Sequence, residues 1–207
     1  MNSKTKWNTK HTERMNDLSE PAPNPRLKNL TAYLKGGQAL DLACGLGGNS
    51  LFLAHMDYQV QAIDISDVAI NYIQEQATKN NLNIHPRVCD LTDLTNLQWQ
   101  ASSFDLVIIT YYLNRTLFPI MRNIINENGY FFMETFSHTA VTENQGVSTK
   151  YKLQPNELLA EFNDWKVLYF EENEQEGRQT IFCQNDEGAQ TVDEIGGNDI
   201  VVNTLDL

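Results

Sequence analysis

Residues 39–50 read ALDLACGLGGNS, and this stretch decides the fold that we expect for the whole chain. An apolar run breaks into glycines and resumes as Leu51-Phe52-Leu53-Ala54, which predicts a strand, a tight turn and a helix. In open α/β sheets, ligands bind beyond the carboxyl ends of the strands, and the first strand–helix turn is the usual place. The glycine turn at residues 45–48 is therefore the first candidate for a binding site.

Beyond this turn, strand patterns alternate with helical patterns. Strands are expected at 60–65, 84–89, 104–110 and 129–136, and helices at 67–80, 116–126 (with Pro119 near its first turn) and 155–163. The last two strand patterns, 165–170 and 179–183, lie too close together in the chain to be parallel. We therefore predict an α/β fold with a Rossmann-like, doubly wound sheet of seven strands, mostly parallel with one antiparallel C-terminal hairpin strand.

The chain divides into three expected segments. Residues 39–184 carry the sheet, and residues 1–38 predict one or two short helices broken at the prolines of 21–25. Residues 185–207 are acidic with few large apolar side chains, which predicts a mobile tail. We expect one globular domain with decorations at both ends.

Composition narrows the class of protein. The 207 residues carry a net charge of −12, and ten of the 27 acidic residues but only one of the 15 basic residues follow residue 170. This balance disfavours binding to nucleic acid or anionic lipid. Cys44, Cys89 and Cys183 suggest no disulfide framework, and no apolar run reaches the roughly 20 residues of a membrane span. We expect a cytoplasmic protein without a metal site, in which Cys44 and Cys89 are small buried fillers.

Three classes of ligand use a glycine turn of this kind. A phosphate-binding P-loop needs Lys followed by Ser or Thr after its last glycine, and Asn49-Ser50 stands there instead. The second class is a dinucleotide site, whose motif is G-x-G-x-x-G. The case for this class is weaker because Ser50 stands where the third glycine would be. An adenosyl amino acid is the third class. Asp64, 19 residues beyond Gly45, is placed to accept the hydroxyls of a ribose, which suits the second and third classes equally.

Two further carboxylates favour the third class. Asp90 ends the strand pattern at 84–89, where its side chain can accept the exocyclic amine of an adenine. Asp41 lies inside the first strand, where burial of a carboxylate is costly unless it is hydrogen-bonded. A cationic ligand or the amides of the turn would offset that cost.

At these motifs the chain resembles a known family. The run DLACGLGGN, the DIS that ends the second strand, the CDL that ends the third and the closing hairpin resemble class I S-adenosylmethionine-dependent methyltransferases over residues 7–184. YLNRTLFP at 112–119 and ETF at 134–136 resemble the small bacterial branch related to the tellurite-resistance methyltransferase. The resemblance implies transfer of a methyl group from S-adenosylmethionine by direct displacement.

The resemblance also implies roles for individual residues. Around the methionine part of the cofactor it places Asp41, Ala43, Cys44, Gly45, Gly47 and Asn49; around the ribose, Asp64, Ile65 and Ser66; around the adenine, Cys89, Asp90 and Leu91. Thr110 and Tyr111 would pass beside the sulfonium. The segment from Trp7 to His11 would form a lid over the cofactor, although His11 stands where the family more usually has Tyr.

The sequence indicates less clearly which residues would bind the methyl acceptor; these are called the acceptor side. Tyr111, Arg115 and Glu134 are the candidate catalytic residues, and Arg115 and Glu134 are expected to open onto one crevice, where they pair with each other or bind an acceptor. The Asp/Asn-Pro-Pro-Tyr tetrad of amino-methylating nucleic-acid enzymes is replaced by residues 110–113, and no Pro-Cys pair is present. These features favour a small-molecule or metalloid acceptor. A non-catalytic S-adenosylmethionine-binding regulator and an NAD-linked oxidoreductase remain the alternatives.

Overall fold

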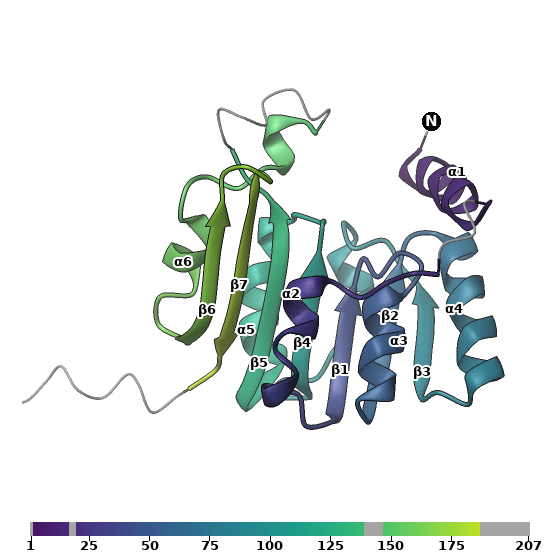
Figure 1. The fold of residues 1–207 in the computed structure, drawn as a ribbon, viewed down its shortest axis with the longest axis horizontal. Helices are drawn as coiled ribbons and strands as arrows, with labels where there is room; N and C mark the ends of the chain where they lie inside the picture. Colours follow the sequence, from purple (N-terminus) through teal and green to yellow (C-terminus); the bar gives the residue numbers. More distant parts are fainter. Residues whose placement is uncertain (1, 17–19, 139–146, 187–207) are drawn as a thin grey trace, which may run out of the picture.

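The computed structural model describes residues 2–16, 20–138 and 147–186. Its centre is a seven-stranded sheet in the order β3-β2-β1-β4-β5-β7-β6 (Figure 1). The strands are β1 Gly37–Leu42, β2 Tyr58–Asp64, β3 Ile84–Val88, β4 Phe104–Thr110, β5 Ile125–Phe136, β6 Lys166–Asn173 and β7 Arg178–Gln184. The first five pair in parallel, whereas β7 is antiparallel to both β5 and β6. The predicted fold, including its single antiparallel strand, is confirmed.

Helices cover both faces of the sheet. They are α1 Ser3–Asn16, α2 Pro25–Lys28, α3 Gly48–His55, α4 Asp67–Asn80, α5 Phe118–Ile124 and α6 Glu157–Glu161, with 3-10 turns η1 Thr31–Tyr33, η2 Leu94–Asn96, η3 Arg115–Leu117 and η4 Thr149–Tyr151. Figure 1 shows α2, α3 and α4 on one face and α5 and α6 on the other. The sheet therefore separates two hydrophobic cores.

Strand β4 shows how one sequence supplies both cores. Leu106 and Ile108 pack in the core on the side of α3 and α4, while Val107 and Ile109 pack in the core on the side of α5 and α6. All four side chains are at most 1% exposed. A strand buried on both faces reads as a nearly continuous apolar run, which is why its sequence has no polar alternation.

One expected boundary is wrong. The helix predicted at 116–126 is the 3-10 turn η3 followed by α5, which ends at Ile124, and β5 begins directly at Ile125. Asn128, with φ 63°, and Gly129 lie inside β5, so the Asn-Gly pair is an irregularity within the strand and not a turn before it. A Cβ at residue 129 would lie 2.8 Å from Ile125 Cγ2, so close packing requires the glycine.

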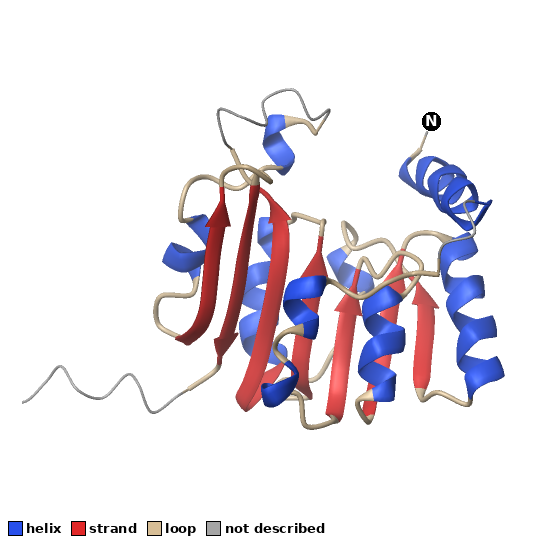
Figure 2. Cartoon of the chain, viewed as in Figure 1, coloured by secondary structure: helices blue, strands red, loops and turns tan. Residues whose placement is uncertain are grey.

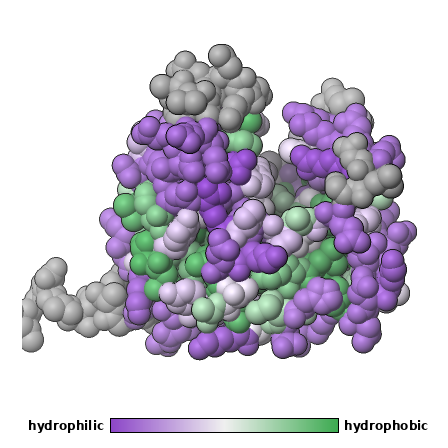
Figure 3. Space-filling view, viewed as in Figure 1, coloured by the Kyte–Doolittle hydropathy of each residue, from purple (hydrophilic) through white to green (hydrophobic). Residues whose placement is uncertain are grey.

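The N-terminal segment crosses the edge where β1 to β4 end. Figure 2 shows loops gathered at this edge, and α1 lies above its β3 side, against α4. In the space-filling view the edge is hollowed between α1 and the β5–β7 part of the molecule, with hydrophilic residues on both rims (Figure 3). None of the helices within the described ranges is long and apolar enough to cross a membrane. The tail predicted at 185–207 lies outside the described residues, except for Asn185 and Asp186.

Candidate functional site

The glycine turn joins β1 to α3 at the carboxyl edge of the sheet. Ala43, Gly45 and Gly47 have φ between 54° and 79°, so the turn is left-handed at three positions. A Cβ at Gly47 would lie 2.6 Å from Ile73, and a Cβ at Gly48 would lie 2.3 Å from the carbonyl oxygen of Ala22. These two glycines are explained by packing. Gly45 is different, because the lid residue His11 is what a Cβ there would meet, at 3.3 Å.

Asp64 links the glycine turn to the turn between β2 and α4 by hydrogen bonds. Its Oδ2 accepts the Gly45 N–H at 2.9 Å, and its Oδ1 accepts the Ser66 N–H at 2.9 Å. The Ser66 hydroxyl caps α4 by accepting the Ala69 N–H at 3.2 Å. An ionised carboxylate has about four acceptor positions, so Asp64 keeps capacity for further donors such as ribose hydroxyls.

Asp41 is completely buried below the turn. The Ser50 hydroxyl donates to its Oδ2 at 2.5 Å, while its Oδ1 has no hydrogen-bond partner among the described residues. Burial raises the pKa of Asp41 to about 7; the Ser50 bond opposes this rise, and the charge of Asp64 adds to it. A buried acceptor without a donor is costly, and a cationic ligand group would remove that cost.

Two other predicted residues lie in this region: Cys44, which was expected to be buried, is only partly buried, and Leu91 is buried. Burial raises the pKa of the Cys44 thiol well above its usual value, which keeps the group neutral. Leu91 is 4% exposed and belongs to the hydrophobic core around α5 and α6. Its carbonyl accepts the Asn114 side chain at 3.3 Å.

Helix α1, the predicted lid, packs near the glycine turn. Trp7 and His11 stack with ring centroids 5.7 Å apart, and His11 is 2% exposed. Burial lowers the pKa of His11, with the nearby Asp64 opposing this shift, and its Nδ1 lacks a hydrogen-bond partner among residues 2–16, 20–138 and 147–186. The expected lid is thus positioned with a buried, unsatisfied ring nitrogen beside Gly45.

Sequence reasoning missed the residue that docks this helix. Asn8 Nδ2 donates to Asp67 Oδ1 at 2.6 Å, and Asn8 Oδ1 accepts the Ser66 hydroxyl at 2.7 Å. Lys4 forms an ion pair with the same Asp67 at 2.9 Å. Lys4, Asn8 and His11 are spaced by four and three residues, which places them on one face of a helix. That spacing was the signal available in the sequence.

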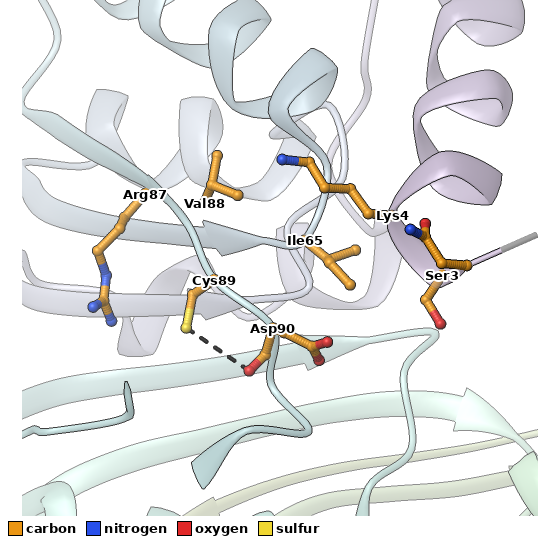
Figure 4. A pocket seen from close by; sticks show the side chains of 8 residues that line it. Ser3, Lys4, Ile65, Arg87, Val88, Cys89 and Asp90 are labelled. Atoms are coloured by element: carbon orange, nitrogen blue, oxygen red, sulfur yellow. Dashed lines mark hydrogen bonds between the residues drawn. The ribbon is translucent and has the colours of Figure 1, made fainter. Parts of the chain in front are cut away.

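A cavity of about 640 Å³ opens beside β2 and β3 (Figure 4). Its lining brings together three predicted residues, Ile65, Cys89 and Asp90, with residues that sequence analysis did not select: Asn2, Ser3, Lys4, Arg87 and Val88. Figure 4 shows Ser3 and Lys4 of α1 on one side of the cavity and Asp90 on the other. Asp90 Oδ1 accepts the backbone N–H and the hydroxyl of Thr92, at 2.9 and 2.7 Å.

Two predicted cofactor residues, Asn49 and Thr110, meet near the candidate acceptor residue Tyr111. Asn49 Nδ2 donates to Thr110 Oγ1 at 3.2 Å, which joins the start of α3 to the end of β4. Asn49 Oδ1 accepts the backbone N–H of Asn24 at 2.7 Å. The N-terminal segment is therefore tied directly to a predicted cofactor residue.

Glu134 lies at the centre of a buried polar network on the acceptor side. The residue is 0% exposed, and its Oε1 accepts the Tyr111 hydroxyl at 2.6 Å. Thr180 Oγ1 donates to its Oε2 at 2.9 Å. Arg26 Nη1 and Arg178 Nη1 lie 3.3 and 3.6 Å from the carboxylate oxygens. Every one of these partners comes from a different element from Glu134.

Tyr111 is the exposed member of this network. It is 42% exposed and has a φ of 57°, a strained conformation for a residue other than glycine. Burial of its hydroxyl, together with the hydrogen bond to Glu134, raises its pKa to about 12. The Arg178 guanidinium lies 5.1 Å from its ring centroid, and Arg178 Nη1 donates to its hydroxyl at 3.1 Å.

Arg115 does not join Glu134, so the pairing considered from sequence is absent. Its guanidinium donates to Glu157 at 2.5 and 2.8 Å and to the carbonyl of Lys152 at 3.1 Å. The Arg115 side chain is 43% exposed. Glu157 lies 42 residues beyond Arg115 in the chain, and no local sequence pattern indicates which carboxylate Arg115 will meet.

Comparison with known proteins decides the family. The family model described as "Tellurite resistance protein TehB" matches residues 24–189, most of the chain. The chain belongs to the TehB family. This membership confirms the resemblance read from the glycine turn and the strand-end motifs.

A curated member of the TehB family matches part of the chain. A Haemophilus influenzae protein named "Probable S-adenosyl-L-methionine-dependent methyltransferase TehB" is 29% identical over 140 residues, which cover 66% of this chain and 48% of that protein. The chain thus spans about half the length of the curated relatives it matches.

Solved structures share the fold. The crystal structure of TehB from Haemophilus influenzae aligns with a TM-score of 0.67 and 23% identity, covering 79% of this chain and 62% of that one. A structure described as a SAM-dependent methyltransferase from Aquifex aeolicus aligns with a TM-score of 0.64 and 16% identity, covering 89% and 100%. The Rossmann-like fold of this TehB family member is confirmed.

Proposed function

We propose that this chain is an S-adenosylmethionine-dependent methyltransferase that acts on a small-molecule or metalloid acceptor by direct displacement. The observation that carries the choice of cofactor is the buried Asp41 Oδ1, which lacks a hydrogen-bond partner among the described residues. The ammonium group of an adenosyl amino acid supplies a cation for that atom, whereas NAD has no amino-acid ammonium. Family membership and the name of the Haemophilus influenzae relative support the same assignment.

The residues present fit the cofactor part by part. Asp41 and the 43–49 turn would hold the methionine end, and Asp64 has acceptor capacity for the ribose. The cavity beside Ile65, Cys89 and Asp90 would take the adenine, under α1. When bound, the cofactor supplies a methyl group on a sulfonium, which is already a good leaving group.

The chain itself would then align the acceptor and exclude water. Proximity and orientation contribute strongly to such a displacement, and no covalent protein intermediate is required. Tyr111 stays neutral near pH 7 because its pKa is about 12, so it orients an acceptor and does not deprotonate it. Arg178 is placed beside the Tyr111 hydroxyl, where its planar guanidinium can donate to an oxyanion.

The acceptor class rests on different observations. The net charge of −12 disfavours a polyanionic acceptor, and the family is described by tellurite resistance. Glu134 is fully buried, so its contact with an acceptor runs through Tyr111. Arg115, predicted as a catalytic residue, is held by Glu157 and is the weakest of the three candidates.

Thermal melting tests the cofactor. S-adenosylhomocysteine at 100 times its Kd should stabilise the fold by about 2.7 kcal/mol, while NAD and ATP at equal concentration should leave the melting temperature unchanged. An equal response to NAD would favour the oxidoreductase and contradict the proposal.

An acceptor screen tests catalysis. Release of S-adenosylhomocysteine should be measured with tellurite, small thiols and small carboxylic acids, against a reaction without acceptor. Turnover of one of these by the native chain, lost in Tyr111→Phe, supports a methyltransferase. Tight cofactor binding without turnover of any acceptor would support the non-catalytic regulator instead.

A further inference from the structure

The segment from residue 20 to residue 24, named here the strap, crosses the carboxyl edge of the sheet between α1 and α2. Its Ala22 carbonyl oxygen lies 2.3 Å from the place that a Cβ on Gly48 would occupy, so the strap rests directly on the start of α3. The backbone N–H of Asn24 donates to Asn49 Oδ1 at 2.7 Å. The strap is thereby fixed to the cofactor side of the edge.

The Asn24 side chain points to the other side. Its Nδ2 donates to Glu134 Oε1 at 2.8 Å and lies 3.5 Å from the Tyr111 hydroxyl oxygen. Its Oδ1 accepts the backbone N–H groups of Arg26 and Leu27, at 2.9 and 3.3 Å, and so caps α2. Asn24 is 6% exposed. One buried side chain thus joins the strap, the start of α2 and the acceptor-side network.

Glu134 needs this donor because its carboxylate is completely buried. Oε1 receives two short hydrogen bonds, one from Asn24 and one from Tyr111, so the two donors share the same oxygen. The backbone of Tyr111 also bonds to the Glu134 carbonyl, at 2.8 Å. The orientation of the strained Tyr111 therefore depends on where Asn24 holds the Glu134 carboxylate.

We propose that Asn24 is a positioning residue of the acceptor site: anchored to Asn49, it holds Glu134, and through Glu134 it orients the Tyr111 hydroxyl. The catalytic part of this inference, that Tyr111 orients an acceptor, rests on the proposed function. The structural relation between Asn24, Glu134 and Tyr111 is testable without an acceptor.

Asn24→Asp separates positioning from helix capping. An Asp keeps the cap on α2, since Asp and Asn are equally good N-caps, and it keeps the backbone bond to Asn49. The substitution replaces only the amide group that donates to Glu134, so the carboxylate introduced at position 24 would face the Glu134 carboxylate. At low pH the two carboxylates would share one proton. The other charged and titratable groups around the pair are Arg26 of α2, Tyr111 at the end of β4 and Arg178 of β7, with Glu171 and Glu176 beyond Arg26.

The experiment is a pH titration of the Tyr111 Cζ resonance by NMR in protein labelled with ¹³C-tyrosine, assigned with Tyr111→Phe. In Asn24→Asp we expect an additional titration step between pH 5 and pH 8, with a resonance like that of the native protein at the acid end. Asn29→Asp is the matched control, since it makes the same change at an exposed residue just beyond α2. Its curve should follow the native protein.

Further measurements decide the remaining outcomes. At pH 8, turnover of the acceptor found in the screen should fall at least tenfold in Asn24→Asp and recover toward pH 5.5, while affinity for S-adenosylhomocysteine stays within threefold. A native-like Tyr111 curve in the folded variant overturns the inference. Should Asn24→Asp fail to fold, Asn24→Ser keeps a cap and must shift the Tyr111 resonance at every pH, or the inference fails. Failure of the native protein to bind S-adenosylhomocysteine overturns the proposed function alone.

Discussion

Asp41 shows how one residue links stability to ligand binding. With a pKa of about 7 in the folded chain, against an ordinary value near 3.8, the folded state binds more protons than the unfolded state between these values. Stability contributed by the neutral form is therefore lost as the pH rises through that window. A ligand cation that favours the ionised form would bind more tightly above pH 7.

We expect Asp41→Asn to remove this pH dependence. Between pH 5.5 and pH 7 the native chain should lose about 2 kcal/mol of unfolding free energy relative to the variant, at about 1.4 kcal/mol per pH unit. Thermal or denaturant unfolding at several pH values measures this difference. Any cost of burying an extra amide is independent of pH and does not obscure it. Parallel stability curves for the two proteins would show that Asp41 is ionised throughout.

Asp64 has a structural role beside its predicted role in binding ribose. Replacing Asp64 with Ala removes the acceptor of two backbone N–H groups, each worth about 1.5–3 kcal/mol as a bond to a charged group. We expect a lower melting temperature and weaker binding of S-adenosylhomocysteine in calorimetry on the remaining folded protein. If the variant is less stable but binds S-adenosylhomocysteine with unchanged affinity, Asp64 only stabilises the turn and does not bind the ribose.

At the scale of elements, α1 is held on α4 by polar side chains and by the burial of His11. Asn8 spans Asp67 and Ser66, and both lie at the start of α4. Because Ser66 also bonds to Asp64 through its backbone, the docking of α1 is connected to the predicted ribose site. The predicted lid is therefore connected through Asn8 and Ser66 to the turn after β2.

Asn8→Ala should loosen α1 and weaken cofactor binding together. Loss of two hydrogen bonds of about 0.5–1.5 kcal/mol each, or about 1–3 kcal/mol together, predicts a Kd for S-adenosylhomocysteine raised about 5- to 140-fold. Hydrogen exchange of residues 3–16 should rise in the same variant. Thr9→Ala, on an exposed position of the same helix, is the control and should change neither quantity. Faster hydrogen exchange in α1 with an unchanged Kd for S-adenosylhomocysteine would show that the docking of α1 does not contribute to cofactor binding.

At the scale of the whole molecule, the charge distribution limits the partners. The net charge of −12 disfavours binding of polyanions, and three arginines near Glu134 and η3, namely Arg26, Arg115 and Arg178, each form an ion pair with a carboxylate. We expect no shift of duplex DNA or RNA in electrophoretic binding assays at low salt, where electrostatic binding is strongest. Salt-sensitive retention of either nucleic acid would contradict the proposed small acceptor.

Local sequence patterns by themselves determined the order and type of the elements and the positions of the cofactor motifs. An apolar run such as 104–110 forms a strand wherever both faces are covered, and the residues that follow strand ends must meet at one edge of a parallel sheet. Gly45, Asp64 and Asp90 were predicted as cofactor residues for this reason.

Only the tertiary structure showed which residues contact the candidate acceptor residues Glu134 and Arg115. Asn24 and Glu134 are separated by 110 residues, and Arg26 and Glu171 by 145, yet these pairs meet because the strap crosses the edge at one particular place. The pairing of Arg115 with Glu157, and not with Glu134, follows from the same long-range arrangement. Periodicity and motif spacing report short-range geometry along the chain. The path of the strap is set by packing between distant segments, and no residue pattern within the strap encodes which carboxylate it will reach.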